Sequence, residues 1–172
     1  FFSMNFDAAA EQWMTPLSSG ATIVVPSASE LSIDNFTSLI IRHSISTLHL
    51  PPAYLRLLLP SARRSAASVR VCIAGGEAWF TGDLAATEET FPNVRLVNAY
   101  GPTETIITPT AWVGSSAAGI AGDYVPIGQP VGKRSAYVLD DELNLVPPGV
   151  IGELYMGEQG LARGYLSRPA LT

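Results

Sequence analysis

The sequence predicts an α/β fold in which a parallel β-sheet carries helices on its faces and a small antiparallel β element follows. In the first two thirds of the chain, short apolar runs alternate with helix-like stretches, which is typical of βαβ units. After about Thr110 the helical periodicity disappears, and short strand-like runs alternate with Gly, Pro and Asp turns. With 172 residues, 47% of them hydrophobic, the chain can bury a core of ordinary domain size.

Helices are expected where a capping residue or a proline precedes a run with one apolar face. The expected helices cover residues 7–17, 32–43, 51–58 and 82–90. Strands are expected where apolar residues run together between turn residues. The expected strands cover residues 21–25, 45–50, 69–74 and 94–97. Because strands and helices alternate, we expect the sheet to be parallel and covered on its faces.

The last third of the chain has a different pattern. Residues 114–122 are rich in Gly, Ala and Ser, which predicts a surface loop. Three strand-like runs follow, at 136–139, 143–146 and 153–156. An Asp-Asp turn separates the first two, and a Pro-Pro-Gly turn separates the last two, so we expect a small antiparallel element.

Charge and cysteine content exclude several classes of function. The net charge is −5 and Lys133 is the only lysine, so no basic stripe exists for nucleic acid. No apolar run approaches the length of a membrane span. Cys72, the only cysteine, lies in an apolar run and is expected to be a buried apolar side chain. Without a disulfide framework or a signal peptide, the sequence favours the cytoplasm.

The run from Asn98 to Thr105 is the strongest functional signal. It follows the expected strand 94–97, and the carboxyl ends of strands are where open α/β sheets bind ligands. Tyr100 can stack on a base, Thr103 can donate to a phosphate oxygen, and Glu104 can hold Mg²⁺. The alternative is an ordinary strand-to-helix turn, with Thr103 as the N-cap and Glu104 at the positive end of the helix dipole.

This run resembles the nucleotide-binding core motif of adenylate-forming enzymes, in particular the adenylation domains of nonribosomal peptide synthetases. Three further stretches agree with that family in the expected order. Residues 6–12 resemble its amino-acid-anchoring motif, 74–78 its glycine loop, and 152–168 its late structural motif. The resemblance implies a flavodoxin-like subdomain over residues 1–112 and the start of a β-barrel-like subdomain over 113–172. Residues 152–168 carry no obvious catalytic group and are interpreted as a family marker.

The resemblance implies that ATP and Mg²⁺ activate an amino acid as aminoacyl-AMP, releasing pyrophosphate. The aminoacyl group then passes to phosphopantetheine on a peptidyl carrier domain. Thr103 would contact the α-phosphate, Glu104 would hold Mg²⁺, Tyr100 would stack on adenine, and Asn98 would read its amine. Gly75 and Gly76 are expected beside the base, where a Cβ would clash. The remaining nucleotide-side residues are Glu77 and Gly101.

The resemblance also implies a substrate pocket in which Asp7 anchors the α-ammonium group. The residues expected around the substrate side chain are Ala8, Glu11, His49, Ile73, Gly75, Ala99, Ile107 and Thr108. A buried Glu11 carboxylate is costly without a cation, which favours a basic substrate such as lysine or ornithine. Three alternatives stay open. In the first, Asp7 is only an N-cap. In the second, Glu11 faces solvent and pairs with an arginine. In the third, His49 is an ordinary histidine that neither orients Glu11 nor contacts the ligand.

Several family motifs are not found in the sequence. These are the phosphate loop, the Tyr-x-Thr-Gly-Asp aspartate and the small domain with its catalytic lysine, which Lys133 does not match. We therefore expect an internal part of a larger adenylation domain that does not complete adenylation alone. A fragment of an acyl- or aryl-CoA ligase is an alternative, which Asp7 argues against. A non-catalytic, exchangeable scaffold is a second alternative, and the need for a small helper protein stays open.

Overall fold

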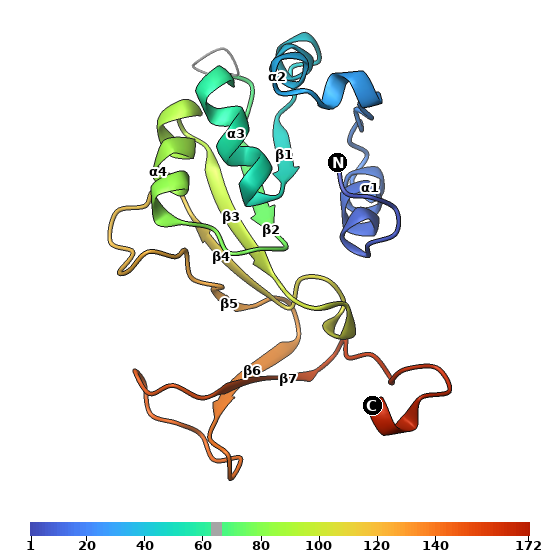
Figure 1. The fold of residues 1–172 in the computed structure, drawn as a ribbon, viewed down its shortest axis with the longest axis vertical. Helices are drawn as coiled ribbons and strands as arrows, with labels where there is room; N and C mark the ends of the chain where they lie inside the picture. The colour runs from blue at the N-terminus through green and yellow to red at the C-terminus, as the bar shows by residue number, and fades with distance from the viewer. Residues whose placement is uncertain (63–66) are drawn as a thin grey trace.

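The computed structural model describes residues 1–62 and 67–172 and contains two β-sheets with helices (Figure 1). The helices are α1 (Ala8–Ser18), α2 (Ile33–Arg42), α3 (Pro52–Ala62) and α4 (Thr81–Thr90), with 3₁₀ turns η1 (Ala28–Leu31), η2 (Thr103–Thr105) and η3 (Pro169–Leu171). The strands are β1 (Thr47–Leu50), β2 (Val71–Gly75), β3 (Arg95–Tyr100), β4 (Thr110–Gly114), β5 (Gln129–Pro130), β6 (Arg134–Leu139) and β7 (Glu153–Glu158).

The first sheet has the strand order β1-β2-β3-β4-β5. Strands β1, β2 and β3 are parallel to one another, because α3 and α4 provide the crossovers between them. Strand β4 then pairs antiparallel with β3, and β5 pairs antiparallel with β4. The second sheet is the antiparallel pair β6–β7, which lies below the first in Figure 1. The predicted α/β fold with a following antiparallel element is confirmed.

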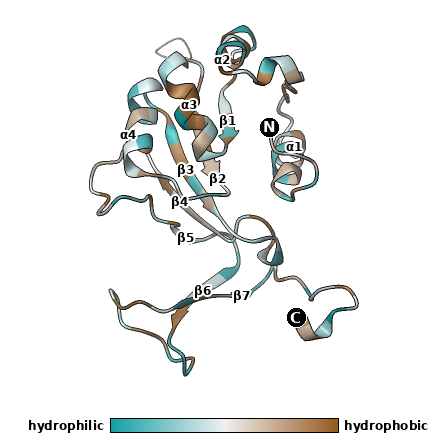
Figure 2. Cartoon of the chain, in the orientation of Figure 1, coloured by the Kyte–Doolittle hydropathy of each residue, from teal (hydrophilic) through white to brown (hydrophobic). Residues whose placement is uncertain are grey.

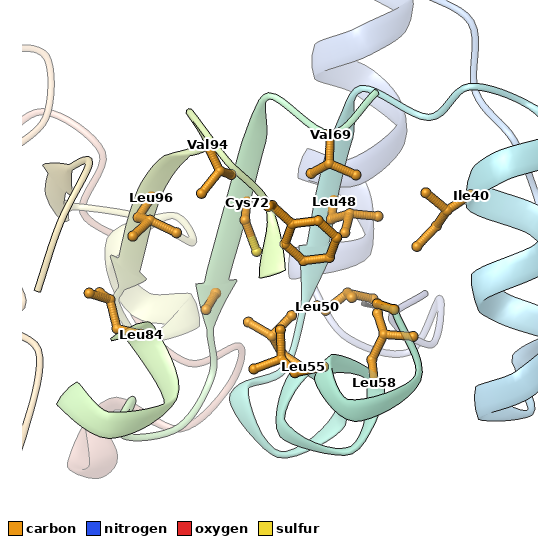
Figure 3. Close-up of a cluster of buried hydrophobic side chains, with 14 of the residues drawn as sticks. Ile40, Leu48, Leu50, Leu55, Leu58, Val69, Cys72, Leu84, Val94 and Leu96 are labelled. Carbon is orange, nitrogen blue, oxygen red and sulfur yellow. The ribbon is translucent and has the colours of Figure 1, made fainter. Parts of the chain in front are cut away.

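The hydrophobic core lies between one face of the first sheet and helices α3 and α4. Figure 2 shows hydrophobic segments along α3, and Figure 3 shows strand residues meeting helix residues in this core. The buried strand residues include Leu48, Leu50, Cys72, Ala74 and Leu96. Burial raises the pKa of the Cys72 thiol to about 12, so the expected inert, buried cysteine is confirmed. No helix within the two described ranges is both long and apolar enough to cross a bilayer.

Two sequence predictions about the elements are wrong, and two strands were not predicted. Residues 21–25 form no strand and pair with no described strand, although β1 is an edge strand, and Val25 is 82% exposed. Residues 143–146 keep only one bridge, Leu139 to Leu145. The sequence analysis also missed β4 and β5. Strand β4 spans the predicted division between residues 112 and 113, which stays a prediction.

Candidate functional site

The carboxyl ends of the three parallel strands bring predicted substrate residues to one face of the sheet. His49 pairs in register with Ile73, and Gly75 pairs with Ala99. Side chains alternate along a strand, so these four residues face away from the core that Leu50 and its neighbours form. The structure therefore places half of the predicted side-chain pocket on the sheet face opposite α3 and α4.

The two glycines of the predicted glycine loop are required for different reasons. A Cβ on Gly75 would lie 2.5 Å from the Ala99 carbonyl oxygen, so β3 leaves no room for it. Gly76 has open space around it but adopts a φ of +87°, which residues with a Cβ rarely adopt. The protein backbone itself thus excludes a side chain at Gly75, and the position of both glycines beside a base stays a prediction.

Asp7 precedes α1 and keeps one carboxylate oxygen without a partner. Its side chain makes no capping hydrogen bond, although Asp7 is the N-cap residue. Its Oδ2 atom is buried and has no hydrogen-bond partner among the residues that the structure describes. One turn later, the Gln12 Nε2 atom donates to the His49 carbonyl oxygen at 2.7 Å, which ties α1 to β1. Buried polar atoms normally find a donor, so this oxygen is suited to a ligand that brings one.

A second group of predicted residues lines a cavity of about 320 Å³ between α1 and the loop after η2. The Thr108 hydroxyl donates to Glu11 Oε2 at 3.0 Å across this cavity. Its lining residues are Ala10, Glu11, Met14, Thr15, Ile106, Ile107, Thr108, Val131 and Arg134. Asp7, Ala8 and His49 do not line it. The predicted pocket residues therefore fall into two groups, one on the sheet face and one in this cavity.

Arg134 is a residue of this cavity that the sequence analysis missed. Its guanidinium donates to the carbonyl oxygens of Ile106 at 3.4 Å, Thr108 at 3.5 Å and Val131 at 3.3 Å. Within the described part of the chain, it forms no ion pair with Glu11. An arginine at the start of a strand gives no local signal, because only the fold brings it beside α1.

The loop held by Arg134 has an unusual backbone. Ile106 and Ile107 adopt φ values of 53° and 60°, in the left-handed region that β-branched residues avoid. Such residues cost on the order of 1–3 kcal/mol each and persist where surrounding contacts hold them. Besides Arg134, a bond from Thr108 N to Ile106 O at 2.8 Å holds this turn. Strain of this kind is often found at binding sites, so these φ values agree with the prediction that Ile107 and Thr108 lie near a ligand.

His49 is neutral at physiological pH. Burial lowers its pKa to about 4. The Phe2 ring packs edge-on against the imidazole, with 5.2 Å between centroids. No hydrogen bond joins His49 to Glu11 in the described structure, so His49 does not orient Glu11 here.

The predicted nucleotide-side residues surround the end of β3. Tyr100 is 42% exposed there, with its ring available for stacking. Asn98 is buried, and its Nδ2 donates to the carbonyl oxygens of Val125 at 3.2 Å and Pro126 at 3.0 Å. Those bonds fix the amide, and Oδ1 accepts no hydrogen bond within the described ranges, so it is the atom left for a ligand.

Two further nucleotide-side residues have a structural role of their own. Glu77 Oε1 accepts a hydrogen bond from Ala53 N at 2.8 Å, in the first turn of α3. A Cβ on Gly101 would lie 1.9 Å from Pro109 Cδ, so only glycine fits at this turn. Both residues thus shape the loops around the end of β3, whatever they contact in a complex.

Thr103 and Glu104 lie in the short turn η2, where the alternative of an ordinary helix start does not hold. The N-cap position is Pro102, and η2 is only three residues long. The Tyr165 hydroxyl donates to Glu104 Oε1, and Ala162 N donates to the Glu104 carbonyl oxygen at 2.7 Å. The bond from Tyr165 holds the pKa of the Glu104 carboxyl below its usual value.

Residues 152–168 were expected to be a family marker without a catalytic group, and the structure places part of this segment beside η2. Ala162, Gly164 and Tyr165 line a second cavity, of about 290 Å³, together with Thr103, Glu104 and Thr172. Across the described residues, no group of three or more His, Cys, Asp or Glu side chains could hold a metal. A Mg²⁺ ion commonly keeps waters and substrate phosphates as ligands, so the predicted role of Glu104 does not require such a group.

Comparisons with known proteins agree along the whole chain. A family model described as "AMP-binding enzyme" matches residues 1–166. Malpinin synthetase of Mortierella alpina is 36% identical over 173 residues, which cover 100% of this chain and 2% of that protein. Tyrocidine synthase 1 of Brevibacillus parabrevis is 35% identical over 175 residues, which cover 100% of this chain and 15% of the synthetase.

A solved structure of the nonribosomal peptide synthetase FmoA3 (S1046A), in an AMPPNP-bound form, has the same fold. It superposes with a TM-score of 0.89 at 27% identity, and the match covers 98% of this chain and 19% of that one. This chain therefore spans only a small part of the relatives that it matches.

Proposed function

The chain belongs to the family of AMP-binding enzymes, and we propose that it is the amino-acid-selecting core of an adenylation domain. The domain would couple an amino acid to ATP, giving aminoacyl-AMP and pyrophosphate. A peptidyl carrier domain would then accept the aminoacyl group on its phosphopantetheine thiol, in nonribosomal peptide synthesis. A reaction that consumes ATP, together with the single buried cysteine, favours a cytoplasmic location for the protein.

The unpartnered oxygen of Asp7 is the observation that carries this proposal. Its Oδ2 is buried without a donor, and an α-ammonium group would supply both donors and the opposite charge. An acyl or aryl acid has no such group, so it would leave the carboxylate unpaired at a cost. The geometry thus favours an amino acid over the substrates of the alternative acyl- or aryl-CoA ligase.

The residues at the end of β3 fit the nucleotide. Tyr100 would stack on adenine, and Asn98 Oδ1 would accept a hydrogen bond from its exocyclic amine. Thr103 would donate to the α-phosphate, on which the substrate carboxylate attacks while the bond to the β-phosphate breaks. Glu104 would hold Mg²⁺, which when bound neutralises charge on the phosphates. The chain's own contribution is mainly positioning and charge stabilisation.

The cavity beside α1 supports a substrate side chain that donates hydrogen bonds. Glu11 Oε2 accepts a bond from Thr108, and Oε1 accepts none within the described ranges. A basic side chain, such as that of lysine or ornithine, would satisfy this oxygen. Arg134 lines the same cavity, but its guanidinium is already bonded to three carbonyl oxygens. These neutral acceptors leave its positive charge in place, so Arg134 opposes a cation, whereas the negative charge of Glu11 favours one; we keep the basic substrate as our proposal.

A chimera tests the proposal. Residues 1–172 would replace the matching segment of a well-behaved adenylation domain, and ATP–pyrophosphate exchange would be measured over amino acids, benzoates and fatty acids. We expect exchange with a new preference for a basic amino acid, and a loss of that preference in Glu11→Ala. A folded chimera that keeps the host's preference would show that the assignment of Asp7, Glu11 and His49 is wrong. Exchange with benzoates alone would favour the aryl-acid ligase, and no exchange or ATP binding would favour the scaffold.

A further inference from the structure

We propose that Tyr165 is a positioning residue for Glu104, holding one carboxylate oxygen so that the other is presented to Mg²⁺. The inference rests on the proposed function and adds to it a residue from the second half of the chain. It concerns a contact between segments 61 residues apart in the sequence. No sequence motif joins them, and only the fold brings the loop after β7 against η2.

The two carboxylate oxygens of Glu104 differ in their hydrogen bonds. The Tyr165 hydroxyl donates to Glu104 Oε1, and Oε2 accepts no hydrogen bond within the described ranges. The same segment also holds the backbone, because Ala162 N donates to the Glu104 carbonyl oxygen at 2.7 Å. Glu104 is thus fixed at its main chain and at one oxygen, which leaves a single oxygen free toward the cavity that it shares with Thr103.

Glu104 needs such help because its own element is short. Turn η2 has three residues, and the Glu104 side chain is exposed. A free glutamate side chain loses about 1.5–2 kcal/mol of rotamer entropy when it is fixed. A partner that fixes the carboxylate beforehand reduces what Mg²⁺ binding must overcome, as hydrogen-bond partners of metal ligands do elsewhere. Tyr165 is itself 48% exposed, so its hydroxyl adds little to the hydrophobic core.

The test is the magnesium dependence of the chimera that carries residues 1–172. Tyr165→Phe removes only the hydroxyl. Tyr155→Phe is the matched control, because the Tyr155 hydroxyl also donates to a glutamate, Glu153 Oε2 at 3.2 Å, on β7 away from η2. Two quantities would be measured: the Mg²⁺ concentration that gives half-maximal exchange, and the calorimetric affinity for ATP with Mg²⁺ and without amino acid.

We expect Tyr165→Phe to raise the Mg²⁺ midpoint and weaken Mg²⁺-dependent ATP binding by about 10-fold, the lower end for such partners because the contact is exposed. The melting temperature stays unchanged, and Tyr155→Phe behaves like the parent chimera. In a Glu104→Gln background, Tyr165→Phe adds nothing further.

Three results overturn the inference. One is a Tyr165→Phe chimera with parental Mg²⁺ dependence, and another is an equal effect of the change in the Glu104→Gln background. The third is a Glu104→Gln chimera with parental Mg²⁺ dependence. The failure of the proposed function looks different: the parent chimera itself would neither exchange pyrophosphate nor bind ATP with Mg²⁺, and the inference would fall with it.

Discussion

Replacing Asp7 by asparagine is expected to stabilise the free protein and to slow its amino-acid-dependent reaction. The side chain of Asp7 makes no capping hydrogen bond, so asparagine loses no contact of that kind. The buried Oδ2 atom has no donor, so removing the negative charge relieves an uncompensated burial. In a complex, the same change removes the proposed partner of the α-ammonium group.

The two effects differ in size as well as in sign. An unsatisfied buried polar group costs about 1–3 kcal/mol, and Asp7 is only half-buried, so we expect a gain near the lower limit. For a domain of this size, about 1 kcal/mol raises the melting temperature by roughly 2–4 °C. Losing a charged hydrogen bond to substrate costs about 3 kcal/mol, which lowers kcat/KM for the amino acid about 100-fold.

Thermal unfolding and pyrophosphate exchange of the chimera measure both effects. Asp34→Asn is the control, because Asp34 also lies in the first turn of a helix, α2, and is exposed there. We expect Asp34→Asn to change stability by a few tenths of a kcal/mol and exchange not at all. A less stable Asp7→Asn protein with unchanged exchange would refute the reasoning, since Asp7 would then act only as part of the helix start.

Four further predictions follow from single features. Gly75→Ala is expected to destabilise the fold by about 1–3 kcal/mol, because its Cβ meets the Ala99 carbonyl oxygen. Gly82→Ala in α4 has open space around it and is expected to stabilise the fold by about 0.5–1 kcal/mol. Thermal unfolding of the two variants measures both effects. The pKa of His49 is about 4 in the folded protein, so the unfolded protein binds this proton more readily. The free energy of unfolding is therefore expected to fall by on the order of 2–3 kcal/mol as pH falls from about 6.5 to 4. Urea unfolding of His49→Gln across this pH range is expected to show no such decrease. The Cys72 thiol, fully buried with its pKa raised to about 12, is expected to react with a disulfide reagent only at the rate of unfolding, which urea accelerates. Arg134→Gln removes the cation from the cavity of Glu11, so exchange with lysine relative to glutamine is expected to rise about 10-fold, and an unchanged ratio would show that Arg134 does not act on the substrate.

The regular elements were predictable where a local pattern decides them. Helices α1 to α4 and strands β1 to β3 appear close to where the local pattern placed them, and the buried core covers one side of α2 to α4 and of the strands. Residues 21–25 have the same strand pattern but pair with no strand in the described part of the chain, so the pattern alone does not decide their structure. Strands β4 and β5 are interrupted by Gly and Pro. Strand β4 forms by pairing with the edge of β3, and β5 forms by pairing with β4. Both pairings depend on the tertiary fold and not on a local pattern.

The candidate site was predictable in part, for a similar reason. A motif names residues that are close in sequence, and the register of β1 to β3 does bring His49, Ile73, Gly75 and Ala99 to one face. A motif does not name the partner that a residue meets from elsewhere in the chain. The contacts of Thr108 with Glu11 and of Asn98 with residues 125–126 span 97 and 27–28 residues, and no local pattern carries them.

The loop from Thr103 to Thr108 connects the two halves of the site physically. At one end, Glu104 is held by Tyr165 and Ala162, on the nucleotide side. At the other end, Thr108 bonds to Glu11 on the substrate side, and Arg134 bonds to the backbone at residues 106 and 108. Because the loop holds two left-handed isoleucines between these ends, it cannot shift one end freely without changing the other. A substitution that alters how the substrate side chain seats against Glu11 is therefore expected to change the Mg²⁺ dependence as well, although the two groups share no direct contact.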